Sequence, residues 1–224
     1  MLVGNWMNTK PVTVSPETSM MRASKLMKDT KSQGLCVVEE GGRLVGIVTD
    51  RDIKEASPSK ATTLDVHELY YLLSEITIKD IMTTKLLTVH TNESVEKAAL
   101  MLQKHQIGAL PVLDDEEKLV GILSQSDVFD VLIRITGVQH GGFQFSIDLE
   151  DIPGTMAELV DFLNKRHARI MSILTAYEPE DIKYRKVFVR IQDMPHSEQE
   201  KLLSELGEKY HIRYTLKENL SDLL

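Results

Sequence analysis

The sequence contains an internal repeat, and this feature constrains the fold more than any other. Shifting the chain by 75 positions aligns residues 6–53 with residues 81–128 without a gap. Identical residues meet along the alignment, including Leu-Val-Gly-Ile at both 44–47 and 119–122. Because repeated sequence folds into repeated structure, we expect two tandem copies of one supersecondary unit. We also expect the copies to pack sheet against sheet as a pseudo-twofold pair.

Each copy predicts the element order β-α-β-β-α. A hydroxyl residue that can cap a helix, Ser19 or Ser94, precedes apolar residues at helical spacing. Two short apolar runs separated by a polar turn then predict a pair of strands. A final short helix is expected to begin at Thr49 or Ser124. The predicted strands span residues 35–38 and 44–48 in the first copy, and residues 110–113 and 119–123 in the second.

The pattern changes after Gly141-Gly142. Alternating and amphipathic segments there predict the order β-α-β-β-α-β of ferredoxin-like folds. The predicted class of the whole chain is therefore α+β. The expected strands are residues 143–149, 170–175, 184–191 and 212–216, and the expected helices are residues 156–163 and 197–210. The predicted domains are a first repeat (1–60), a helical linker (61–75), a second repeat (76–138) and a ferredoxin-like unit (143–217).

Composition excludes several classes of function. The formal net charge of −8 argues against a surface for nucleic acid or anionic membrane, since both require clustered Lys and Arg. One cysteine, Cys36, excludes an internal disulfide, and its apolar neighbours predict a buried residue. The N-terminus lacks the pattern of a signal peptide, and no apolar run approaches the ~20 residues of a membrane span. We therefore expect a cytoplasmic protein.

The sequence shows no catalytic chemistry. The seven histidines are scattered without metal-ligand spacing, and the chain has neither a Gly-x-Ser-x-Gly motif nor a P-loop lysine motif. We predict no catalytic residues, no bound metal and no cofactor other than a regulatory ligand.

A hydroxyl residue stands three positions before an aspartate at the same place in both copies: Thr49 before Asp52, and Ser124 before Asp127. This spacing resembles a capping box, in which both residues serve the start of a helix. It also fits a ligand site, because a hydroxyl can contact phosphate and a carboxylate can accept both hydroxyls of a ribose. A glycine three residues before each pair would let backbone approach such a ligand. Capping and ligand binding are compatible.

The duplicated motif Gly-apolar-apolar-Thr/Ser-x-x-Asp, with the stretch Ile107–Val112, resembles the CBS domain family over about residues 1–136. Members pair in tandem as Bateman modules. The resemblance implies a regulatory ligand held between the repeats: AMP, ADP, ATP, cyclic di-AMP or S-adenosylmethionine. It also implies a homodimer and a regulated partner, which could be a metabolic enzyme.

The resemblance implies two pockets. The first would use Thr49 and Asp52, the backbone of Ile107, Gly108 and Ala109, and Met82 and Leu87 against adenine. The second would use Ser124, Ser126 and Asp127, the backbone of Gln33, Gly34 and Leu35, and Met7 and Val12. The cations expected near phosphate are Lys10, Arg51 and Lys85. Core packing is an equal alternative for both methionines, and plain surface is an equal alternative for each cation.

The turn Asp151-Ile152-Pro153-Gly154 resembles the ligand loop of ACT domains, small regulatory modules that pair into dimers. This turn would face an amino acid, although the same residues also make a good turn. The order CBS-CBS-ACT over the whole chain resembles the acetoin-utilisation proteins of Gram-positive bacteria. That likeness implies a role in acetoin or butanediol use, including in sporulating cells. Two alternatives remain: a structural dimerisation protein, and an enzyme whose site forms at a dimer interface.

Overall fold

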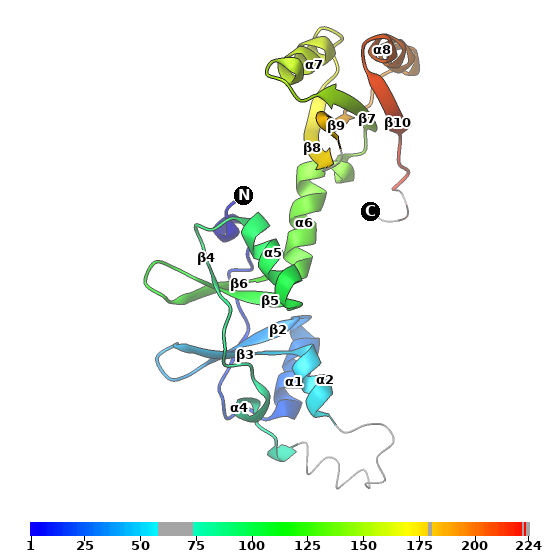
Figure 1. Ribbon diagram of the computed structural model, residues 1–224. Coiled ribbons are helices and arrows are strands. Elements are labelled where there is room, and N and C mark those ends of the chain that lie inside the picture. The colour runs from blue at the N-terminus through cyan, green and yellow to red at the C-terminus, as the bar shows by residue number, and fades with distance from the viewer. Residues whose placement is uncertain (58–73, 179–180, 221, 223–224) are drawn as a thin grey trace. The chain divides into compact units, whose positions relative to one another are not determined.

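The structure is a computed structural model that describes residues 1–57, 74–178, 181–220 and 222. The predicted linker helix, residues 61–75, lies almost wholly outside the described residues. The chain divides into two compact units, Met1–Phe129 and Asp130–Leu224 (Figure 1).

The two repeats have the same fold. In each, a two-residue strand pairs in parallel with the strand after the helix, which pairs antiparallel with the next strand. The predicted order β-α-β-β-α is therefore confirmed for both copies. The first repeat consists of β1 Thr13–Val14, α1 Met20–Thr30, β2 Gly34–Val38, β3 Leu44–Thr49 and α2 Asp50–Ala56. The second consists of β4 Val89–His90, α5 Val95–His105, β5 Ala109–Leu113, β6 Leu119–Ser124 and α6 Gln125–Thr136.

The long helix of each repeat begins and ends by the same local chemistry. Ser19 caps α1 by accepting a hydrogen bond from the backbone of Arg22, and Ser94 caps α5 in the same way. Each helix ends at a residue in the left-handed conformation, Lys31 (φ 52°) or Gln106 (φ 53°). Such a residue closes the last turn and redirects the chain. The loops that follow lead directly into β2 and β5.

Each repeat also binds the chain that precedes the other repeat. Residues 1–8, the N-terminal arm, include the short helix η1 Val3–Asn5 and pair with the second repeat. Residues 76–83, the connecting arm, include α4 Ile78–Ile81 and pair with the first. Asn8 donates to Ile122 at 2.9 Å, and Thr83 donates to Ile47 at 2.9 Å. The two pairings differ by the same 75 positions as the sequence repeat, so the exchange follows the pseudo-twofold relation.

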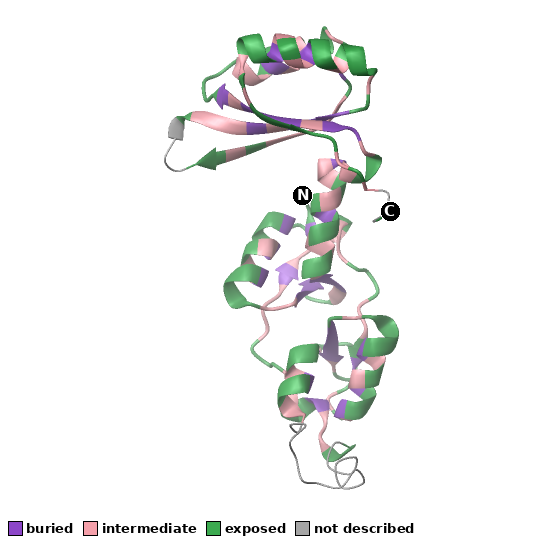
Figure 2. Cartoon of the chain, turned by 90° about the vertical axis from the view of Figure 1, so that its right-hand side faces the viewer, coloured by how far each residue is buried: buried purple, intermediate pink, exposed green. Residues whose placement is uncertain are grey.

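Apolar residues of both repeats form the core of the first unit. In the first repeat, α1, β2 and β3 contribute buried residues to one cluster, which includes the fully buried Leu35 of β2 and Val48 of β3. Figure 2 shows buried segments on both the helices and the strands of the repeats. Ile78 of the connecting arm joins this core. Between the repeats, Cys36 of β2 packs with Ala109 of β5 and Ile122 of β6. Cys36 is fully buried, as its apolar neighbours predict.

The second unit is a four-stranded antiparallel sheet in the order β10-β7-β9-β8 with α7 and α8 on one face (Figure 1). The predicted order β-α-β-β-α-β is confirmed. Strands β8 and β9 continue beyond their predicted ends because Glu178 still pairs with Asp181, although the outer residues do not alternate in polarity. A short helix, η2 Val138–His140, precedes the unit's elements: β7 Phe143–Glu150, α7 Thr155–Asn164, β8 Ile170–Glu178, β9 Asp181–Ile191, α8 His196–Lys209 and β10 His211–Leu216.

Candidate functional site

A cavity of about 660 Å³ opens between the two repeats of the first unit. Its volume lies within the roughly 300–1,000 Å³ of typical small-molecule sites. The first repeat contributes the end of α1, the loop after it and the junction of β3 and α2, whereas the second contributes residues 105–109. Residues that follow the connecting arm, including Leu87, form a further wall. We name this cavity the first site.

Thr49 and Asp52 lie in the first site and hydrogen-bond to each other. Asp52 Oδ2 accepts from the backbone N–H of Thr49 and from its hydroxyl, both at 2.7 Å. The Thr49 hydroxyl oxygen accepts from the backbone of Asp52 at 3.4 Å. The pair is therefore a complete capping box at the start of α2. No described residue donates a hydrogen bond to Asp52 Oδ1, so one carboxylate oxygen is available to a ligand.

Ser124 and Asp127 repeat this geometry at the start of α6. Asp127 Oδ2 accepts from the Ser124 backbone at 2.6 Å and from its hydroxyl at 2.7 Å. We name the positions around this pair the second site, because each is a repeat equivalent of a position in the first.

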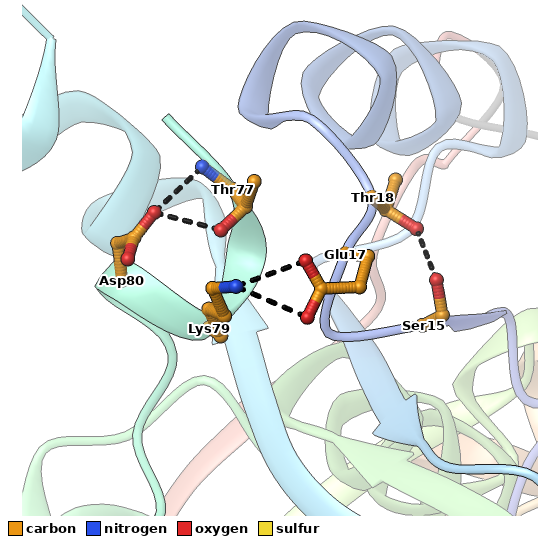
Figure 3. Close-up of polar contacts among 6 residues, drawn as sticks. All are labelled: Ser15, Glu17, Thr18, Thr77, Lys79 and Asp80. Atoms are coloured by element: carbon orange, nitrogen blue, oxygen red, sulfur yellow. Dashed lines mark hydrogen bonds and ion pairs between the residues drawn. The ribbon is translucent and has the colours of Figure 1, made fainter. Parts of the chain in front are cut away.

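A third capping box stands outside the first site, at α4. Asp80 Oδ2 accepts from the backbone of Thr77 at 2.9 Å and from its hydroxyl at 2.7 Å (Figure 3). These hydrogen bonds hold the pKa of Asp80 below its usual value. Lys79 of the same helix pairs with Glu17 at 3.0 Å, which ties the connecting arm to the first repeat. A hydroxyl residue three positions before an aspartate is therefore a capping signal here, and only its location in a cavity points to a ligand.

The first site contains most of the residues predicted for it. The structure brings Thr49, Asp52, Arg51, Lys85, Leu87 and residues 107–109 together around one cavity. Met82 is the exception, since it packs against Gly46 and the apolar core of the first repeat instead of lining the cavity.

Gly46 and Gly121, which recur at the same place in the two repeats, have neighbours other than the predicted ligand. A Cβ atom on Gly46 would overlap the side chain of Met82, and a Cβ atom on Gly121 would overlap Met7. At both positions a methionine from the neighbouring arm fills the space beside the glycine, and at Gly121 a Cβ would also lie 2.9 Å from the backbone oxygen of Asn8. In this structure Met82 and Met7 occupy the space beside Gly46 and Gly121 that the sequence pattern predicts for a ligand.

The second site differs from the first in its contacts. The Gln33 side chain donates from Nε2 to the hydroxyl of Ser126 at 2.8 Å, a contact between the two repeats. Leu35 is fully buried and Val12 packs against the core of the first repeat. Gly34 pairs with Thr49 in the sheet. Lys10 is exposed, and its backbone donates to the side chain of Asn8.

A family model for the CBS domain matches residues 3–59 and 78–134. The chain belongs to the CBS domain family. Both matched segments contain most of an arm and the repeat that follows it along the chain.

Relatives place this CBS pair in different protein contexts. A CBS domain-containing protein of Dictyostelium discoideum is 30% identical over 134 residues, 60% of this chain and 92% of that protein. The L-aspartate semialdehyde sulfurtransferase of Methanocaldococcus jannaschii is 32% identical over 127 residues, 57% of this chain but only 22% of the enzyme. The crystal structure of a Vibrio cholerae protein assigned to acetoin utilization is 27% identical, with a TM-score of 0.51. That match covers 62% of this chain and 95% of the other.

Sequence reasoning missed several residues of the first site. Lys28, Lys31, Thr83, His105 and Gln106 all line the cavity. The two lysines stand at the end of α1, where basic residues are common because they complement the helix dipole, so nothing marked them as ligand contacts. Thr83 reaches the site through the pairing of the connecting arm with Ile47, which leaves no periodic pattern.

Other chemistry is not evident in the described part of the chain. No group of three or more His, Cys, Asp or Glu side chains there could hold a metal ion. Burial raises the pKa of the Cys36 thiol to about 12, which makes it a poor nucleophile. Across the same residues, no helix has both the length and the apolar character needed to cross a membrane.

The ACT-like turn lies between β7 and α7 in the second unit. Gly154 adopts φ of +100°, which only glycine tolerates readily, and a Cβ there would meet open space. Ile152 is exposed, and Asp151 lies 3.5 Å from Arg185. Pro153 precedes the glycine, so the turn is preformed and accessible.

Proposed function

We propose that the chain is a non-catalytic regulatory protein that binds an adenosine nucleotide in the first site. The observation that carries the proposal is that residues from both CBS repeats line one cavity of suitable volume, with an aspartate carboxylate at its wall. A ligand that touches both repeats can favour one arrangement of them over another, and a partner can respond to that difference. The family resemblance implies such a ligand between the repeats.

Each wall of the first site has a chemical role in this proposal. Asp52 Oδ1, to which no described residue donates a hydrogen bond, would accept hydrogen bonds from the ribose hydroxyls. Asp52 Oδ2 would keep its hydrogen bonds to Thr49 at the start of α2. Ile47 and Leu87 supply apolar surface for the adenine ring. The backbone around Gly108 can bond the edge of the base, and Arg51 and Lys85 are near enough to the cavity to contact phosphate.

A thermal-shift experiment tests the proposal. Purified protein is heated with AMP, ADP, ATP, cyclic di-AMP or S-adenosylmethionine, and with amino acids as a comparison. A ligand present at 100 times its Kd stabilises the folded state by about 2.7 kcal/mol, which raises Tm measurably. Stabilisation by an adenosine compound, with no product detected by chromatography, supports a sensor. Turnover of the compound supports an enzyme instead.

A purely structural role is the second candidate, because the capping boxes are closed without any ligand. Replacing both Asp52 and Asp127 by Asn distinguishes the two candidates. The sensor predicts that nucleotide stabilisation disappears from the double variant. The structural role predicts a lower Tm for the double variant and no nucleotide effect in either protein.

We propose a role in acetoin or butanediol use for the whole chain. The likeness to the Vibrio cholerae protein supports this role, since the match covers 95% of that protein's chain. Deletion of the gene from its source organism should slow growth on acetoin but not on glucose. Equal growth on both carbon sources would remove the support.

We also propose that the second unit is an ACT module through which two chains pair. Its sheet order and the exposed turn at Ile152 support this proposal. Light scattering of the full chain should give the mass of a dimer, and a monomer at micromolar concentration would contradict it.

A further inference from the structure

The sequence repeat allows the two sites to be compared position by position, and they differ in charge. Lys28, which lines the first site, corresponds to Gln103 in the second repeat. Arg51, which also lines the first site, corresponds to Ser126. Both differences place a cation in the first site and a neutral side chain in the second. Two positions change in the opposite sense: the acidic Asp50 has the neutral equivalent Gln125, and the neutral Gln106 has the basic equivalent Lys31.

Two of the three described acidic residues that line the first site form ion pairs, and the third, Asp52, caps α2. Asp50 pairs with Lys54 and Glu55 pairs with Arg51 at 2.8 Å, each one turn apart on α2. Within the described residues, Lys28, Lys31 and Lys85 form no ion pair. Three lysines that line the cavity therefore remain for a ligand's negative charge.

The sites also differ in space. Gly108 lines the first site, and among the described residues the only atom within 4 Å of a Cβ built there is the side-chain oxygen of Gln33, at 3.9 Å. The repeat equivalent of Gly108 is Gln33 itself, whose amide bonds to Ser126 across the repeats at 2.8 Å. Gly108, which has no side chain to fill the first site, thus corresponds in the second site to Gln33, whose side chain links the two repeats.

We propose that each chain binds one nucleotide, in the first site, and that it binds ATP and ADP more tightly than AMP. The inference rests on the proposed function and adds its stoichiometry and its preference among phosphates. Lysines without acidic partners favour a ligand that carries more negative charge, because each added phosphate forms further charge-assisted contacts. In the second site the contact between Gln33 and Ser126 bridges the two walls. The first site has four cations among its described residues, Lys28, Lys31, Arg51 and Lys85, whereas the equivalent positions of the second have only two, Lys10 and Lys31.

Calorimetric titration of the full chain with adenosine, AMP, ADP and ATP tests this inference. We expect one ligand per chain and an affinity that rises with the number of phosphates, roughly tenfold or more from AMP to ATP. Raising the salt concentration should weaken ATP more than adenosine, since screening acts on the charged contacts.

The repeat itself supplies the variants. Lys28→Gln with Arg51→Ser gives the first site the residues of the second, and should lower ATP affinity about tenfold while leaving adenosine affinity unchanged. Lys25→Gln is the matched control, because Lys25 is an exposed lysine of the same helix that does not line the cavity. Gln33→Ala with Ser126→Arg removes the bridge and adds a cation, and should create a second equivalent of ATP binding.

The possible results distinguish a failure of this inference from a failure of the proposed function. Two equivalents in the unaltered chain, or equal affinity for AMP and ATP, overturns this inference and leaves the proposed function standing. An equal loss of ATP and adenosine affinity in the Lys28→Gln, Arg51→Ser variant also overturns it. Absence of binding by all four ligands overturns this inference. If cyclic di-AMP and S-adenosylmethionine also give no thermal stabilisation, the proposed function is overturned with it.

Discussion

Replacing Gly46 by alanine tests the account of how the connecting arm binds the first repeat. Gly46 lies buried in β3, and the added methyl group would overlap Met82 of that arm. Overpacking of this kind costs about 1–3 kcal/mol. Removing a glycine from a strand returns about 0.5–1 kcal/mol, because the unfolded chain loses less entropy on folding. We therefore expect a net loss of about 0–2.5 kcal/mol in the free energy of unfolding, with a middle value of about 1 kcal/mol.

The assay is urea unfolding followed by tryptophan fluorescence. Trp6, the single tryptophan, lies in the N-terminal arm and therefore reports on the first unit. Gly34→Ala is the matched control, since a Cβ at this buried strand glycine would make only ordinary contacts of 3.6–3.7 Å. It should be neutral or slightly stabilising.

A double-mutant cycle isolates the contact. Shortening Met82 to alanine removes the obstacle, so Gly46→Ala should cost at least about 1 kcal/mol less in that background. If Gly46→Ala is harmless while Met82 is present, or if its cost is the same without Met82, the packing account of the glycine is wrong.

Three further predictions concern titration and buried charge. Because hydrogen bonds from Thr77 lower the pKa of folded Asp80, the capping box should stabilise the protein above pH 3.8, the ordinary carboxyl pKa. This stabilisation should be lost as the pH falls below that value. Acid unfolding of the Asp80→Asn variant should lack the part of the pH dependence that Asp80 causes. Burial raises the pKa of the Cys36 thiol, so the stability that the neutral thiol contributes should be complete below pH 9.0 and should decline between pH 9.0 and about pH 12. At pH 8 the thiol should resist thiol reagents unless the protein is unfolded. In the second unit, Arg190 is 4% exposed and donates to Glu218 at 2.8 Å, so Glu218→Gln should lower the free energy of unfolding by about 1–3 kcal/mol in calorimetry. An unchanged second-unit transition would contradict that last prediction.

The fold was predictable because its signals are local or duplicated. Cap residues such as Ser19 and Ser94 mark the helices, and short apolar runs mark the strands of each repeat. The duplication predicts that the same architecture occurs twice. The arms were not predictable, because their pairing to the other repeat consists of isolated contacts such as Asn8 with Ile122. Such contacts produce no periodicity, so the sequence did not reveal that Met82 packs on Gly46.

The first site was partly predictable for the same reason. Thr49 and Asp52 stand out because they recur in the second copy, and the family resemblance placed residues 107–109 beside them. Lys28 and Lys31 resemble ordinary solvated lysines at a helix end, and only the tertiary structure brings them to the cavity. The third capping box, at Asp80, shows why the motif without its location would have been misleading.

The most direct test of the central claim compares two aspartates with the same local geometry. Asp52→Asn and Asp80→Asn each remove the carboxylate of a capping box, but only Asp52 lines the first site. Calorimetric titration with ATP should show binding weakened at least tenfold in Asp52→Asn and unchanged in Asp80→Asn. Equal ATP affinity in both variants and the unaltered chain would mean that Asp52 only caps its helix, and would contradict the claim that it holds a nucleotide.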